Sequence, residues 1–157
     1  MDVGSLLEIG PLDARLRCEC CDLPTLRVPL DRYGLHLDEA QVVCPLCEWE
    51  NNPLTDRGAE SEEPASSGER NDGISLAEAR SNFAKFLSMY DPQKLEPWML
   101  GPPSAKVLAR KRALRDAYVD LLGAPEHERW DPLNRVKDCE DALAAQVDGE
   151  RESAQGI

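Results

Sequence analysis

The sequence is poor in positive charge: 18 Lys and Arg face 30 Asp and Glu, which gives a formal net charge of -12 and a pI near 4.6. Proteins that bind nucleic acid without sequence preference need a surplus of Lys and Arg to neutralise phosphates. The composition therefore argues against broad nucleic-acid binding. It favours a basic or otherwise cationic partner.

Long apolar runs are also missing. None approaches the roughly 18 residues that a membrane-spanning helix requires. The opening residues, MDVGSLLE, have no basic region and carry acidic side chains within the apolar patch, unlike a signal peptide. We therefore expect a cytoplasmic protein, in which six cysteines are thiols or metal ligands rather than disulfides.

Apolar material for a core is scarce. Leu, Ile, Val and Phe supply 34 of the 157 residues, just above the fraction below which chains remain disordered. Leu accounts for 21 of these and Val with Ile for 11, so helices are favoured over a large sheet. The core must be small, and part of the chain has reason to need another source of stability.

Cysteine is where the sequence is rich. Cys18 with Cys21 and Cys44 with Cys47 form two C-x2-C pairs, called here the first knuckle (18–21) and the second knuckle (44–47). Two such knuckles place four sulfurs around one Zn2+ at about 2.3 Å, the closed arrangement of a structural site. We therefore predict a structural zinc site, with buried free thiols or a redox dithiol as alternatives.

The remaining cysteines and the two histidines suggest no catalytic site. Cys20 is the spare thiol of the first knuckle, and Cys139 fits a small apolar position in a helix. His36 and His127 have no Ser, Cys or Asp at a spacing typical of a nucleophile and its base. We expect a protein that is not an enzyme.

Three separate segments resemble the bacterial cysteine-rich CPCC family. CECC at 18–21 and CPLCEWE at 44–50 are similar to its CPCC and CPVCFWEDD motifs, and NDGISLAEARSNF at 71–83 to its NG-x-SL-x-EAR-x-NF segment. The resemblance spans about residues 16–87 and implies a zinc-ribbon-like module with a helix. Glu19 stands where the family has proline, and Asp22 where a glycine usually follows. A positive φ after the knuckle would therefore rest on an aspartate.

The predicted fold class is α+β: a small zinc ribbon with short antiparallel strands, followed by about three α-helices. Strand-like segments lie at 23–30 and 40–43, and helices are expected to begin at Ser75, near Ser104 and at Asp131, the last two ending at Gly123 and Gly149. The predicted organisation is a zinc-ribbon-like module at 1–54, an acidic flexible linker at 55–73, a helical region packing on the ribbon at 74–149, and a disordered tail at 150–157.

Charge and the lack of catalytic residues favour a binding protein, such as an immunity protein that neutralises a basic bacterial toxin from the same locus. The candidate partner-binding residues are Glu48, Trp49, Glu50, Asp56, Glu60, Glu62 and Glu63. Trp49 could anchor a partner, although a lid over the zinc site or a contact with the first helix is favoured.

Two other functions stay open. One is a nucleic-acid-associated zinc ribbon that uses the basic helix 104–115, and the other is an enzyme or redox protein that uses Cys20. The basic side chains of that helix are Lys106, Arg110, Lys111, Arg112 and Arg115.

Overall fold

The first part of the chain, which has few apolar residues, forms short strands. In the computed structural model, which describes residues 6–10, 13–52, 71–97, 99 and 101–154, β1 (Leu6–Gly10), β2 (Asp13–Leu16) and β3 (Leu26–Val28) make an antiparallel sheet in the order β1-β2-β3. β4 (Leu30–Asp31) and β5 (Gly34–Leu35) form a separate hairpin. β5 begins directly after the turn with Gly34 at φ 113°, a conformation that side chains disfavour.

The strands only partly follow the sequence prediction. β3 lies within the predicted segment 23–30 and is an edge strand, as its flanking prolines require. The segment 40–43 contributes only an isolated bridge between Val43 and Glu50. β1 and β2 were not predicted. In β2 the polar residues Asp13 and Arg15 alternate with Ala14 and Leu16, but Arg15 is buried together with its apolar neighbours, so the polarity pattern does not report which residues are buried.

The predicted helices are present, and the α+β class is confirmed. They are α1 (Leu76–Phe86), α2 (Ala105–Gly123) and α3 (Trp130–Ala154), with single 3-10 turns at Leu37–Glu39, Asn71–Gly73 and Glu126–Glu128. The predicted cap of α1 is also present, since the Ser75 hydroxyl accepts a hydrogen bond from the Glu78 amide at 3.1 Å. α1 ends at Leu87, whose φ is 58°.

The end of α3 differs from the prediction. Gly149 predicts the end of this helix and a disordered tail at 150–157, but α3 continues to Ala154, and residues 155–157 lie outside the described part. The Glu150 carboxylate accepts hydrogen bonds from the Ser104 hydroxyl and the Gln146 amide, both at 2.7 Å. The contact from Ser104, the N-cap of α2, and the contact from Gln146 within α3 hold the turn beyond Gly149, which outweighs the low helix propensity of glycine.

The chain divides into two compact units, Met1–Asp91 and Pro92–Ile157. In the first, α1 buries Leu76 and Ala79, and the segment after it returns to the second knuckle, where the Met89 amide donates to the Cys47 carbonyl at 2.8 Å. The predicted linker lies largely outside the described residues, apart from the turn at 71–73. The predicted domain boundaries stay predictions.

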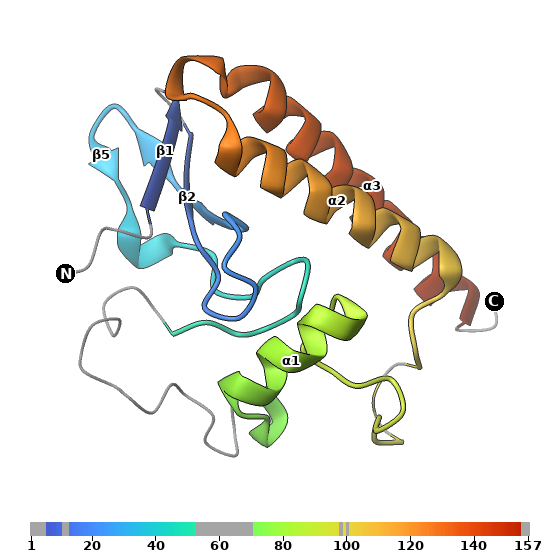
Figure 1. Cartoon of the computed structure of the whole chain (residues 1–157). Coiled ribbons are helices and arrows are strands. Elements are labelled where there is room, and N and C mark those ends of the chain that lie inside the picture. Colours follow the sequence, from blue (N-terminus) through green and yellow to red (C-terminus); the bar gives the residue numbers. More distant parts are fainter. Residues whose placement is uncertain (1–5, 11–12, 53–70, 98, 100, 155–157) are drawn as a thin grey trace. The chain divides into compact units, whose positions relative to one another are not determined.

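In the second unit, α2 and α3 run antiparallel and side by side (Figure 1). Their core is made of the buried residues Val107, Leu114, Ala117, Tyr118, Leu121, Leu133, Val136 and Leu143. The Tyr118 hydroxyl donates to the Glu140 carboxylate across this contact. Burial of these side chains is the main source of stability for a helix pair, because isolated helices are marginal in water.

Replacing Leu114 with alanine tests this core. Leu114 is 0% exposed, so Leu114→Ala should lower the free energy of unfolding by about 2–5 kcal/mol through lost burial and a residual cavity. Val119→Ala is the matched control on the same helix, because Val119 is 53% exposed and its change should stay within about 0.5 kcal/mol. Urea unfolding followed by circular dichroism measures both, and equal effects would contradict the assigned core.

Candidate metal centre

The first knuckle is a tight turn between β2 and β3. The Asp22 amide donates to the Cys18 carbonyl at 2.9 Å, and the Cys20 amide lies 3.4 Å from the Cys18 Sγ. The residue after the knuckle, Asp22, has a φ of 61°, as expected from the missing glycine. An amide directed at a sulfur favours the thiolate form that binds metals.

The second knuckle repeats this geometry. The Glu48 amide donates to the Cys44 carbonyl at 3.0 Å, and the amides of Leu46 and Cys47 each lie 3.4 Å from the Cys44 Sγ. Glu48 follows the knuckle with a φ of 73°. Both turns therefore end on a residue in the left-handed region and direct backbone N–H groups at the first cysteine of the pair.

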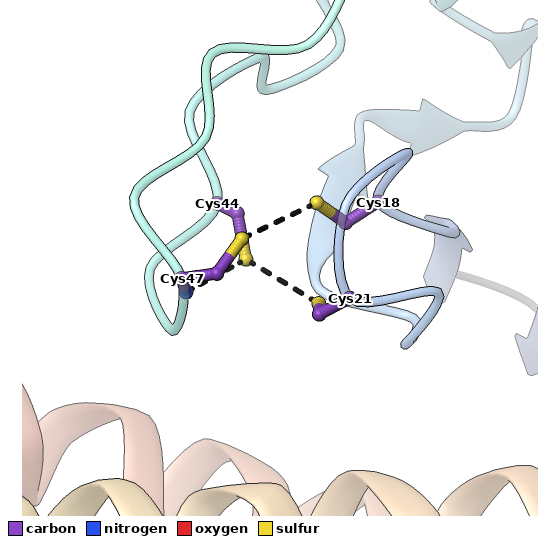
Figure 2. A group of neighbouring side chains, drawn as sticks. All are labelled: Cys18, Cys21, Cys44 and Cys47. Carbon is purple, nitrogen blue, oxygen red and sulfur yellow. Dashed lines mark hydrogen bonds between the residues drawn. The ribbon is translucent and has the colours of Figure 1, made fainter. Parts of the chain in front are cut away.

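The two knuckles bring their four sulfurs together (Figure 2). All four Sγ atoms lie within 4.8 Å of one another, with 3.6 Å between Cys18 and Cys47 and 3.8 Å between Cys21 and Cys44. A tetrahedron with metal–sulfur bonds of 2.3 Å has edges of about 3.8 Å. The cluster therefore has the dimensions of a four-sulfur metal site, and all six cysteines of the chain are free thiols.

The surroundings of the sulfurs set their acidity. Hydrogen bonds from the other three thiols, Cys21 first, lower the pKa of Cys18, so one thiolate is favoured. Burial raises the pKa of Cys44, and the hydrogen bond with Cys18 raises the pKa values of Cys21 and Cys47. Holding four thiolates in this buried space therefore requires a cation, as expected of a metal site.

Asn51 is a site residue that the sequence analysis missed. It is 1% exposed, and its Nδ2 lies 3.5 Å from the Cys18 Sγ, while its Oδ1 accepts from the Glu19 amide at 2.7 Å. The only signal in the sequence is an asparagine four residues after the last cysteine of the cluster. A polar residue there is equally consistent with the start of a loop.

The candidate partner-binding residues fall into two groups. Asp56, Glu60, Glu62 and Glu63 lie outside the described residues. Of the rest, Glu48 is exposed and accepts from the Ser88 hydroxyl at 3.0 Å, and Glu50 is half-buried. Trp49 is 1% exposed and packs inside the first unit, which fits the favoured interpretation of this residue as a packing contact.

The remaining cysteines and the histidines are not members of the four-sulfur group, although Cys20 lies within the first knuckle. Cys20 is 5% exposed and Cys139 is half-buried on α3. The His36 Nε2 lies 2.9 Å from the Asp31 carboxylate, which raises the pKa of the histidine. His127 is exposed.

The basic helix predicted at 104–115 forms the first half of α2. Its side chains are divided between two environments, since Lys106, Arg110 and Arg112 are exposed whereas Lys111 is 6% exposed. The exposed basic surface is therefore smaller than the sequence suggests.

Comparison with known protein families matches residues 16–96, just over half of the chain, to the family described as cysteine-rich CPCC. The chain belongs to this family. The match contains both knuckles and α1, so the CPCC segment corresponds closely to the first unit, and the resemblance seen at 16–87 is confirmed. No curated protein and no solved structure matches the chain. Within the described part of this CPCC protein, no helix has the length and apolar character needed to cross a membrane.

Two substitutions of Asp22 test the strain after the first knuckle. Asp22→Gly and Asp22→Ala both remove the carboxylate that Arg17 contacts at 2.7 Å, so they differ mainly in tolerance of the positive φ. We expect the glycine variant to be more stable than the alanine variant by about 1 kcal/mol. Thermal or urea unfolding of the two variants measures this difference. Equal stabilities would show that the positive φ at position 22 carries no penalty in the free energy of folding.

Proposed function

We propose that this CPCC protein is a non-enzymatic binding protein whose first unit is held together by a structural Zn2+. The four-sulfur cluster carries this proposal, because its dimensions and burial match a closed site with four protein ligands. Cys18, Cys21, Cys44 and Cys47 are the proposed ligands. Bound zinc would supply folding free energy by joining two turns that lie far apart in the sequence.

Zinc is favoured by the donor set. Four thiolates in a tetrahedral arrangement suit Zn2+ or iron, and the backbone amides directed at Cys18 and Cys44 offset part of the negative charge of four thiolates. No ligand position is left for a substrate in such a set. The role that follows for the metal is to stabilise the fold rather than to catalyse a reaction.

The partner we propose is a basic protein, because the chain carries a net charge of -12. Part of this negative charge lies on the exposed side of α3. Its exposed carboxylates Asp131, Asp138, Asp141, Asp148 and Glu152 lie opposite the buried Leu133, Val136 and Leu143 at helical spacing. Negative charge concentrated on one side of a helix accelerates association with a positively charged surface.

A toxin with a cationic active site is the partner that best fits this description, which would make the protein an immunity protein. The support is the combination of strong negative charge, a small metal-bound fold and no recognisable nucleophile–base pair in the sequence. In this scheme the carboxylates steer the encounter, and apolar contacts at the interface supply most of the affinity.

Metal analysis tests the structural role of zinc. The purified protein should contain one zinc per chain, and Cys44→Ser should lose both the metal and the cooperative unfolding of the first unit, since Cys44 is 0% exposed. Cys139→Ser is the control, because Cys139 belongs to α3 and is not one of the four clustered cysteines, so this variant should retain full metal content. Folded wild-type protein with no zinc or iron would contradict the proposal.

Charge reversal tests the acidic surface. Affinity purification from the native host, followed by mass spectrometry, should identify a basic partner whose activity is inhibited by this protein. A triple variant, Asp138→Lys, Asp141→Lys and Asp148→Lys, should slow association by about tenfold or more and flatten its dependence on salt. The matching asparagine variants should give intermediate rates. An unchanged rate and salt dependence would show that α3 does not steer the encounter.

A further inference from the structure

Asn51 contacts both halves of the candidate metal site. Its Oδ1 accepts from the Glu19 amide in the first knuckle at 2.7 Å, and its Nδ2 lies 3.5 Å from the Cys18 Sγ. The same Nδ2 lies 3.0 Å from the Val42 carbonyl and 3.3 Å from the Trp49 carbonyl, on either side of the second knuckle. One buried side chain thus joins the two turns beside the sulfurs.

A carboxamide matches the partners that this chain offers at position 51, where the CPVCFWEDD motif of the family has aspartate. The side chain must accept from an amide with one atom and donate to a sulfur and carbonyl oxygens with the other, which matches the donors and acceptors of asparagine. An aspartate would place a carboxylate beside a thiolate and two carbonyl oxygens, without a hydrogen to donate. A leucine of similar size would leave the Glu19 amide without its partner, at a cost typical of buried polar groups.

Glu19 in turn holds Asn51 in place. Its carboxylate accepts from the Asn52 amide at 2.7 Å, and its carbonyl accepts from the Arg80 guanidinium of α1 at 2.8 and 3.1 Å. The family has a proline at this position, and a proline has no N–H to give to Asn51. This chain therefore gains a hydrogen bond between knuckles from its departure at position 19.

We propose that Asn51 is a positioning residue of the metal centre. It holds the Cys18 sulfur in its coordinating orientation by a hydrogen bond from Nδ2, while Oδ1 fixes the first knuckle against the second. The proposal rests on the proposed metal site and adds that Asn51 sets how slowly the metal leaves. Residues that hydrogen-bond to metal ligands typically alter metal affinity by about 10–100-fold when replaced.

The decisive experiment compares Asn51 with the other buried asparagine of the first unit. Asn71 is 8% exposed, and its Oδ1 accepts from the Glu50 amide at 2.7 Å while its Nδ2 donates to the Glu50 carbonyl at 3.0 Å, with no sulfur among these contacts. Zinc release to a chromophoric chelator is followed in wild type, Asn51→Asp, Asn51→Leu and Asn71→Asp. The same proteins loaded with Co2+ report sulfur orientation through the thiolate-to-cobalt charge-transfer band.

Both Asn51 variants should release zinc about 10–100-fold faster than wild type and shift the cobalt band. Asn71→Asp should lower stability and leave the cobalt band in place. Wild-type zinc release together with a wild-type cobalt band in the Asn51 variants would overturn the proposal. A shift of equal size in the Asn71 variant would also overturn it, because Asn51 would then act through general stability.

A second pair of variants avoids direct change at Asn51. Glu19→Pro and Glu19→Ala both remove the carboxylate that Asn52 contacts. Only the proline also removes the backbone N–H that donates a hydrogen bond to the Asn51 Oδ1. Release should be faster from the proline variant, and equal release would contradict the role of Oδ1. If wild type binds no metal through these thiolates, the proposed function fails as well. If wild type holds zinc and the Asn51 variants hold it equally, only the role of Asn51 is wrong.

Discussion

Four sulfurs within 4.8 Å of one another, on three buried cysteines and the half-buried Cys21, are the constraint on which the first unit depends. Thiols this close and this buried cannot all ionise without a cation, so the protein must either bind one or retain protons on most of them. The local backbone is shaped by the same requirement. Each knuckle directs amides at its first sulfur and then reverses direction through a left-handed residue, Asp22 or Glu48, at some cost in backbone energy. A core with few apolar side chains depends on these contacts more than a larger core would.

Hydrogen bonds between polar side chains and backbone extend this centre into the rest of the first unit. Arg80 joins α1 to the first knuckle, and Met89 joins the segment after α1 to the second knuckle. The acceptors in these hydrogen bonds are backbone carbonyls, which any sequence supplies. Which segments are joined is therefore decided by the groups that donate to them. This pattern explains how a short helix with only Leu76 and Ala79 fully buried can still belong to the metal-binding unit.

The sequence was informative where a local rule decides the structure. C-x2-C spacing predicted the four-sulfur cluster, and Ser75 with Glu78 predicted the start of α1. It was uninformative where contacts between distant segments decide, as at Asn51, whose role depends on partners at positions 18, 19 and 42. β2 was missed for the same reason, because a buried Arg15 is stable only in its tertiary surroundings. At Gly149 the local rule failed: the glycine predicted the end of a helix, but contacts of the following turn keep α3 helical to Ala154.

The pairing of Asn71 with the backbone of Glu50 has a consequence for how this family can diversify. The chain leaves the second knuckle at Glu50 and is fixed to the same point when it returns at Asn71, by two hydrogen bonds of 2.7 and 3.0 Å. Because these hydrogen bonds hold both anchors, an insertion or deletion between them need not move the second knuckle, and for a flexible chain a doubling in length changes the entropy of closure by only about 0.6 kcal/mol. Asp56, Glu60, Glu62 and Glu63 belong to this interval. The two anchors therefore hold both ends of this interval at one point of the first unit, three residues beyond Cys47.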